Sequence, residues 1–189
     1  TIIVDNTNPT INNLPSDITK STNTGTCNTT VTWTEPTVSD ANAGSTITQT
    51  GGPANGSTFA IGSSTIEYTA TDAAGNNTIS SFTVTVEDKT APVLSAAPAA
   101  VTVNCQSVPA AATLTATDNC DAAPSVSLNE VSTQTATGVG HYNYTITRTW
   151  TATDVAGNSS SVSQVITVQD VTAPVLSAAP AAVTVNCQS

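Results

Sequence analysis

Aspartate and asparagine recur at matching places in this chain of 189 residues, and their oxygens are the groups that could do chemistry. The pattern Asp-x-Ala-Gly-Asn appears twice and ends in Asn76 and Asn158. Ca²⁺ is held by six to eight oxygens from carboxylates, asparagine and backbone carbonyls. Carboxylates that meet without a cation repel one another, and a bound Ca²⁺ would relieve this repulsion. The candidate calcium ligands are Asp88, Asp118, Asp121, Asp154 and Asn158 in one set and Asp5, Asp40, Asp72 and Asn76 in a second set.

The same residues also have interpretations without a metal. Asp-x-Ala-Gly-Asn makes a good hairpin loop, because Asp accepts turn amides, Gly supplies a positive φ and Asn tolerates one. A pair of carboxylates can hydrolyse glycosides, but here the same Asp recurs in each repeat and no aromatic platform for a sugar accompanies it. His141, the single histidine, has no Ser or Cys nucleophile motif nearby. We therefore expect no catalytic residue and no certain cofactor, with Ca²⁺ as the candidate ion.

The chain repeats itself. Asp-x-Thr-[Ala/Asn]-Pro-x-[Leu/Ile] appears as DNTNPTI from Asp5, DKTAPVL from Asp88 and DVTAPVL from Asp170. The spacing gives a unit of about 80 residues, the size of a small β-sandwich module. We expect the tail of a preceding repeat and a linker over 1–8, complete domains over 9–88 and 89–170, and the first strand of a truncated repeat over 171–189. This last stretch carries a perfect copy of Thr90–Ser107.

The elements that must position these residues are strands. Apolar and polar residues alternate in SFTVTVED and in STIEYTATD, and turn signals such as GGPANG and DNCDAAP separate the strands. The predicted fold class is all-β, with tandem immunoglobulin-like antiparallel β-sandwich domains. Proline in the short linkers stiffens the chain, so we expect a rod-like array. In such a sandwich the first strand starts at the pole where two of the loops lie, which would gather each calcium set.

The charge balance excludes several partners. The chain has 13 acidic and 3 basic residues, and its formal net charge is -10. Without clustered cations it will not hold nucleic acid or anionic lipid. Its apolar runs are shorter than a membrane-spanning helix requires, so no membrane insertion is expected. Few lysines, many threonines and some cysteines suit an exported protein.

The assembled motifs resemble a known family. LPSDITKSTNTGTCNTTVTWTEPTVSD and GSTFAIGSSTIEYTATDAAGNNTISSFTVTVED look like the hyalin repeat (HYR), an immunoglobulin-like module of extracellular proteins, over nearly all of residues 9–88. The second unit, with VTVNCQSVPAAATLTATDNCD and TRTWTATDVAGNSSSVSQVITVQD, is similar to repeats of giant adhesins that gliding Bacteroidetes export by the type IX route. The resemblance implies a bacterial cell-surface stalk or adhesin, with adhesion as its role instead of catalysis.

The resemblance also bears on the cysteines. In the adhesin repeats the cysteines of NCQSVP and DNCD occur together, which implies a disulfide between Cys105 and Cys120. A simple hairpin would put the two sulfurs at opposite ends, and a disulfide needs Cα atoms within about 7 Å. The bridge therefore requires residues 106–111 to cross over, and the alternative is two buried, inert thiols. We expect Cys27 to be unpaired and the partner of Cys187 to lie beyond the end of the chain.

The sequence thus predicts a non-catalytic extracellular segment that forms the stalk of a cell-surface adhesin, serving attachment or gliding. Its partners would be neighbouring repeats of the same chain, while other domains bind a surface, glycan or protein target. Two alternatives stay open. One is an accessory module of a secreted hydrolase, and the other is a subunit of a self-assembling extracellular filament that pairs exposed edge strands.

Overall fold

The computed structural model describes residues 5–187, and nearly all of their regular structure is β-strand. The first repeat contains β1 (Thr10–Asn12), β2 (Ile18–Ser21), β3 (Asn28–Thr30), β4 (Thr37–Ser39), β5 (Thr46–Gly51), β6 (Thr58–Ala60), β7 (Gly62–Thr71) and β8 (Asn77–Glu87). The second repeat contains β9 (Val93–Leu94), β10 (Val101–Asn104), β11 (Ala116–Thr117), β12 (Ser125–Ser132), α1 (Val139–Tyr142), β13 (Tyr144–Thr153) and β14 (Ser159–Gln169). The prediction of an all-β immunoglobulin-like sandwich is confirmed.

The main sheet of the first repeat has four strands in the order β2-β8-β7-β5. Ile66 and Tyr68 on β7 and Phe82 and Val84 on β8 are buried, as the alternating pattern predicts. Two smaller sheets, β1-β4 and β3-β6, complete the repeat. The core cluster joins these residues to Val31, Phe59 and Val86, with Ile11, Leu14, Ile18, Trp33 and Ile47 packed against it.

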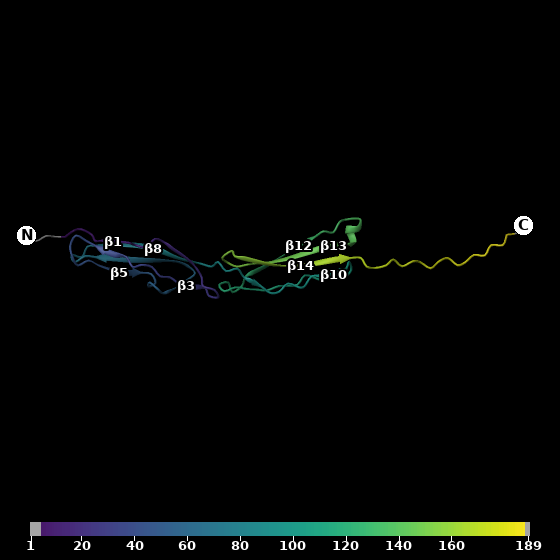
Figure 1. The fold of residues 1–189 in the computed structure, drawn as a ribbon, viewed down its shortest axis with the longest axis horizontal. Helices are drawn as coiled ribbons and strands as arrows, with labels where there is room; N and C mark the ends of the chain where they lie inside the picture. Colours follow the sequence, from purple (N-terminus) through teal and green to yellow (C-terminus); the bar gives the residue numbers. More distant parts are fainter. Residues whose placement is uncertain (1–4, 188–189) are drawn as a thin grey trace, which may run out of the picture. The chain divides into compact units, whose positions relative to one another are not determined.

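The main sheet of the second repeat has the matching order β10-β14-β13-β12 (Figure 1). A small sheet pairs β11 with β9. Ile146, Ile166 and Val168 form its buried cluster. Trp150, on β13, is 2% exposed. The two repeats therefore bury equivalent strands by the same alternation of apolar and polar residues.

Each repeat departs from the antiparallel arrangement at one strand pair. β2 lies parallel to β8, with Ile18 opposite Val84, and β10 lies parallel to β14, with Val101 opposite Ile166. The reason is the route of the chain before β2. β1 pairs with β4 in a different sheet, and the chain then crosses to the edge of the main sheet. Because no hairpin joins β2 to β8, nothing forces them to be antiparallel.

Two compact units result, and their limits differ from those of the repeats. One comprises residues 5–96, 113–128 and 150–162, and the other comprises 97–112, 129–149 and 163–187. Among the residues described, no helix has the length and apolar character needed to cross a membrane.

Residues 171–187 show what a strand needs besides its sequence. They are exposed and contain no helix or strand, although residues 172–187 are identical to residues 90–105, which supply β9 and β10. β9 pairs with β11, and β10 pairs with β14. A strand forms only against such a partner, because its backbone groups bond to another strand. The tail expected over 1–8 falls partly on residues 1–4, outside the described residues.

Candidate functional site

Three aspartates of the first repeat meet at one place. Asp5, Asp40 and Asp72 each offer a carboxylate oxygen, and these three oxygens lie within 4.8 Å of one another. Asp72 is 7% exposed. The sandwich thus gathers three of the four predicted ligands of this set, from the start of the repeat, from the loop after β4 and from the turn after β7.

The turn after β7 is built by Asp72 itself. Its Oδ1 accepts from the amides of Ala74 (2.9 Å) and Asn76 (2.8 Å), and its Oδ2 accepts from Asn76 Nδ2 (2.8 Å). Gly75 takes a φ of 92°, as this hairpin loop requires. The hydrogen bond from the Asn76 side chain, supported by the backbone amides of the turn, lowers the pKa of Asp72 against the opposing effect of burial. Asp72 and Asn76 therefore satisfy each other.

Asn42 donates hydrogen bonds to the other two aspartates of this group, Asp40 and Asp5. Its amide donates to Asp40 Oδ1 (2.9 Å), and its side-chain Nδ2 donates to Asp5 Oδ2 (2.6 Å). The other oxygen of Asp5 accepts from the Thr7 amide (3.0 Å), and the carbonyl of Asp5 accepts from Asn76 Nδ2 (3.1 Å). Both carboxylate oxygens of Asp5 are thus hydrogen-bonded. Sequence reasoning gave Asn42 no role here.

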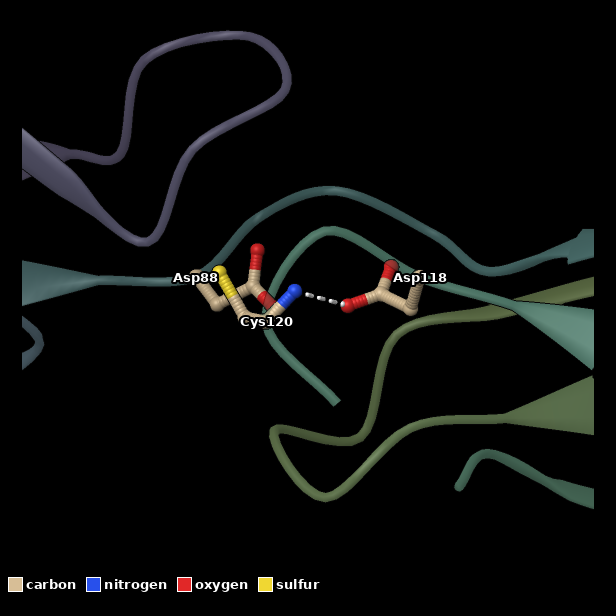
Figure 2. A group of neighbouring side chains, drawn as sticks. All are labelled: Asp88, Asp118 and Cys120. Atoms are coloured by element: carbon tan, nitrogen blue, oxygen red, sulfur yellow. Dashed lines mark hydrogen bonds between the residues drawn. The ribbon is translucent and has the colours of Figure 1, made fainter. Parts of the chain in front are cut away.

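The second repeat brings Asp88 and Asp118 together beside Cys120 (Figure 2). A carboxylate oxygen of each aspartate lies within 4.8 Å of the other and of the Cys120 sulfur. Asp88 Oδ1 accepts from the Thr90 amide (3.0 Å). Asp118 Oδ1 accepts from the amides of Cys120 (2.8 Å) and Asp121 (3.0 Å). One oxygen of each carboxylate is therefore used by the local turn.

The remaining predicted ligands of this set are used in turns. Asp121 accepts from the amides of Ala123 (2.9 Å) and Val155 (2.9 Å). Asp154 accepts from the amide and side chain of Asn158, both at 2.8 Å. Burial acts to raise the pKa of Asp154, but these hydrogen bonds outweigh it and the net pKa is lowered. These residues shape the loop, and Asn158 Nδ2 also donates to the carbonyl of Asp88 (3.2 Å).

Three side-chain oxygens of Asp88 and of the loop at Asp118 are buried without a hydrogen-bond partner among residues 5–187: Asp88 Oδ2, Asp118 Oδ2 and Asn119 Oδ1. Asp88 as a whole is only 6% exposed. A buried acceptor without a partner costs about 1–3 kcal/mol, and more when it is charged. Sequence reasoning missed Asn119, because a single Asn between Asp118 and Cys120 carries no distinctive pattern.

The cysteines pair differently from the expectation. Cys120 is bonded to Cys27, with Cα atoms 5.0 Å apart, and Cys105 is a free, partly buried thiol. The expected bridge between Cys105 and Cys120 does not form, because the sulfur of Cys120 is bonded to Cys27. Cys105 follows β10 and packs against the cluster of Ile166 and Val168. Cys187 is free and exposed.

The loops around the disulfide are also hydrogen-bonded. Asn119 Nδ2 donates to the carbonyl of Thr26 (3.1 Å), next to Cys27. The expectation that Cys27 is unpaired is wrong, because Cys27 is bonded to Cys120 in the loop that carries Asp118.

The chain matches two related families. Residues 4–86 match the HYR domain, and residues 93–168 match the HYR-like domain with 4 cysteines. The second range holds two cysteines, Cys105 and Cys120. Both matches indicate an extracellular, adhesion-type repeat. A search of curated proteins found no match.

The solved structures that match the chain include cadherin domains. Human mucin-like protocadherin EC1-2 is 13% identical over 86% of this chain and 98% of its own, with a TM-score of 0.35. Mouse cadherin-23 EC22-24 is 16% identical over 87% of this chain and 67% of its own, with a TM-score of 0.36. Protocadherin gammaB7 EC3-6 is 18% identical over 86% and 51%, with a TM-score of 0.34.

Proposed function

The chain is a HYR domain followed by an HYR-like domain, and from this premise we propose that it is a non-catalytic stalk segment of a bacterial cell-surface adhesin. In this proposal the segment carries a binding domain away from the cell and serves attachment or gliding. It lies outside the cell, in a protein of the kind exported by gliding Bacteroidetes. Neighbouring repeats of the same chain are its immediate partners.

One observation carries the proposal: the start of each repeat is fixed by the same hydrogen bonds. The carbonyl of Asp5 accepts from Asn76 Nδ2 (3.1 Å), and the carbonyl of Asp88 accepts from Asn158 Nδ2 (3.2 Å). Each of these aspartates also accepts the amide two residues on, as does Asp170 (2.9 Å). A junction built the same way each time suits a chain that extends by adding copies.

The residues that recur between repeats act on the backbone. Each turn is closed by a side-chain hydrogen bond between an aspartate and an asparagine, Asp72 with Asn76 and Asp154 with Asn158. A catalytic pair would instead need oxygens directed at a substrate. This use of the recurring polar residues supports a structural repeat over an enzyme.

Intact cells of the source organism test the proposal. An antibody raised against this 189-residue chain should label their surface without permeabilisation, and deletion of the gene should reduce attachment or gliding. A cytoplasmic antigen used as a control should stay unlabelled. The reading frame should encode many further repeats. A frame with one hydrolase domain and few repeats, or labelling only after lysis, would overturn the proposal.

A further inference from the structure

The two repeats build related acidic loops that differ after the shared aspartate, where Ala41, Asn42 and Ala43 correspond to Asn119, Cys120 and Asp121. Asp40 and Asp118 each accept the amide two residues on, at 2.9 Å from Asn42 and 2.8 Å from Cys120. Asn42 and Cys120 therefore hold equivalent positions. The side chain of Asn42 donates to Asp5 Oδ2 (2.6 Å). The sulfur of Cys120 is bonded to Cys27, carries no proton and cannot donate.

Because Cys120 cannot donate, the aspartate at the start of the second repeat lacks the hydrogen bond that Asn42 gives to Asp5. Asp88, the equivalent of Asp5, keeps a buried Oδ2 for which the described residues provide no donor. The same holds for Asp118 Oδ2 and Asn119 Oδ1. All three atoms are acceptors, two of them on carboxylates. They need a donor or a positive charge, and another acceptor cannot help them.

The basic side chains do not supply that charge. Lys89 pairs with Glu87 (3.0 Å) and its side chain is 62% exposed. Arg148 pairs with Glu130 (2.7 Å) in the other compact unit. Lys20, the third of the 3 basic residues, lies on β2 and faces solvent. The missing donor or positive charge must then come from solution.

We propose that Asp88 Oδ2 and Asp118 Oδ2, together with Asn119 Oδ1, bind one Ca²⁺, and that the Asp5 group of the first repeat binds none. Two oxygens that share a Ca²⁺ at about 2.4 Å each can be at most about 4.8 Å apart. One carboxylate oxygen of Asp88 and one of Asp118 meet this limit. The site is independent of the proposed adhesive role.

The surroundings favour Ca²⁺ over other metals. The donors are oxygens, and the Cys120 sulfur is held in a disulfide, so a thiolate site for Zn²⁺ is not available. A pocket of about 520 Å³ borders Asp88 and another of about 200 Å³ borders Asp118 and Asn119. They leave room for water to complete six to eight ligands. Few protein ligands and water in the shell predict a dissociation constant on the order of 10⁻⁴–10⁻³ M.

The test is calcium binding by the whole chain, measured by equilibrium dialysis with ⁴⁵Ca²⁺ up to about ten times the upper dissociation constant. We expect one ion per chain. Asp88→Asn and Asp118→Asn should each abolish binding, because they remove the charge and keep the oxygen that accepts the turn amides. The matched changes Asp5→Asn and Asp40→Asn should leave one ion bound. Far-UV circular dichroism checks that each variant is folded. No binding by the wild type, retention in Asp88→Asn, or loss in Asp5→Asn would overturn the proposal.

A second pair of variants tests whether the residue at position 120 determines calcium binding. Cys27→Ala with Cys120→Asn should lose the ion, since the new amide can donate to Asp88 as Asn42 donates to Asp5. Cys27→Ala with Cys120→Ala lacks the disulfide as well but adds no donor, and it should still bind one ion. If both double variants lose the ion, or if both retain it, the side chain at position 120 does not decide whether Ca²⁺ binds, and this part of the proposal is overturned.

Discussion

Replacing Cys27 and Cys120 by alanine should lower the free energy of unfolding by several kcal/mol. The disulfide joins residues 93 apart in the sequence. It therefore closes a long loop in the unfolded chain and reduces the entropy of that state. For a loop of this length the chain-entropy relation gives about 4.6 kcal/mol as an upper value, and measured disulfides give about 2–4 kcal/mol. With a urea dependence of about 2 kcal/mol per molar, the unfolding midpoint should fall by roughly 1–2 M.

Urea unfolding under non-reducing conditions measures this change. Wild-type protein treated with a reductant should unfold like the double variant, while Cys105→Ala should leave the wild-type midpoint nearly unchanged. Coincident curves for the wild type and the double variant would refute the reasoning.

Peptide mapping tests the pairing directly. Trypsin can cut after Lys20, Lys89 and Arg148, which puts Cys27 on one peptide and both Cys105 and Cys120 on another. Unreduced digests should contain peptides 21–89 and 90–148 joined together. If peptide 90–148 is instead found alone and closed by an internal disulfide, Cys105 and Cys120 are paired and the structure is wrong at this point.

Three further changes test other contacts. Gly52→Ala should destabilise by at least about 1–2 kcal/mol, because Gly52 has a φ of 78° and a Cβ there would press on the β7 backbone; thermal melting measures it. Glu130→Ala should cost about 1.5–3 kcal/mol in urea unfolding by leaving the buried Arg148 without its carboxylate, and Glu130→Gln should cost less. Asn76→Ala should raise the lowered pKa of Asp72. A lowered pKa contributes stability that is present above the unfolded-state pKa near about 3.9 and lost as pH falls through the folded-state pKa. The stability difference from wild type should therefore be largest at neutral pH and shrink below about pH 4, and a constant difference would contradict it.

The strands could be predicted from the sequence because apolar and polar residues alternate locally along them. Phe82, Val84 and Val86 alternate with polar residues, and the structure buries all three. The parallel pairing of β2 with β8 could not be predicted in this way. It depends on which sheet edge the chain reaches after β1, and no local pattern encodes that crossing.

The candidate site could likewise be predicted from the sequence only in part. Sandwich topology places the loops at one pole, and this was enough to bring Asp88 near Asp118 and Asp5 near Asp40 and Asp72. Hydrogen-bond partners depend on individual side-chain geometry, so the difference between Asn42 and Cys120 appeared only in the structure. The disulfide was missed because the partner of Cys120 lies in the other repeat, 93 residues away.

The parallel edge strands have a mechanical consequence. β2 lies near the start of the first repeat and β8 at its end, with Ile18 opposite Val84 and Ser21 opposite Glu87. Tension applied through the two ends of the repeat would draw β2 toward its first residue and β8 toward its last. In a parallel pair these pulls are opposed along the strand axis, so the ladder is sheared and its hydrogen bonds resist together. A terminal antiparallel hairpin would instead open one bond at a time. Because β10 and β14 repeat the arrangement in the second repeat, each repeat closes its sheet with a pair oriented to withstand stretching.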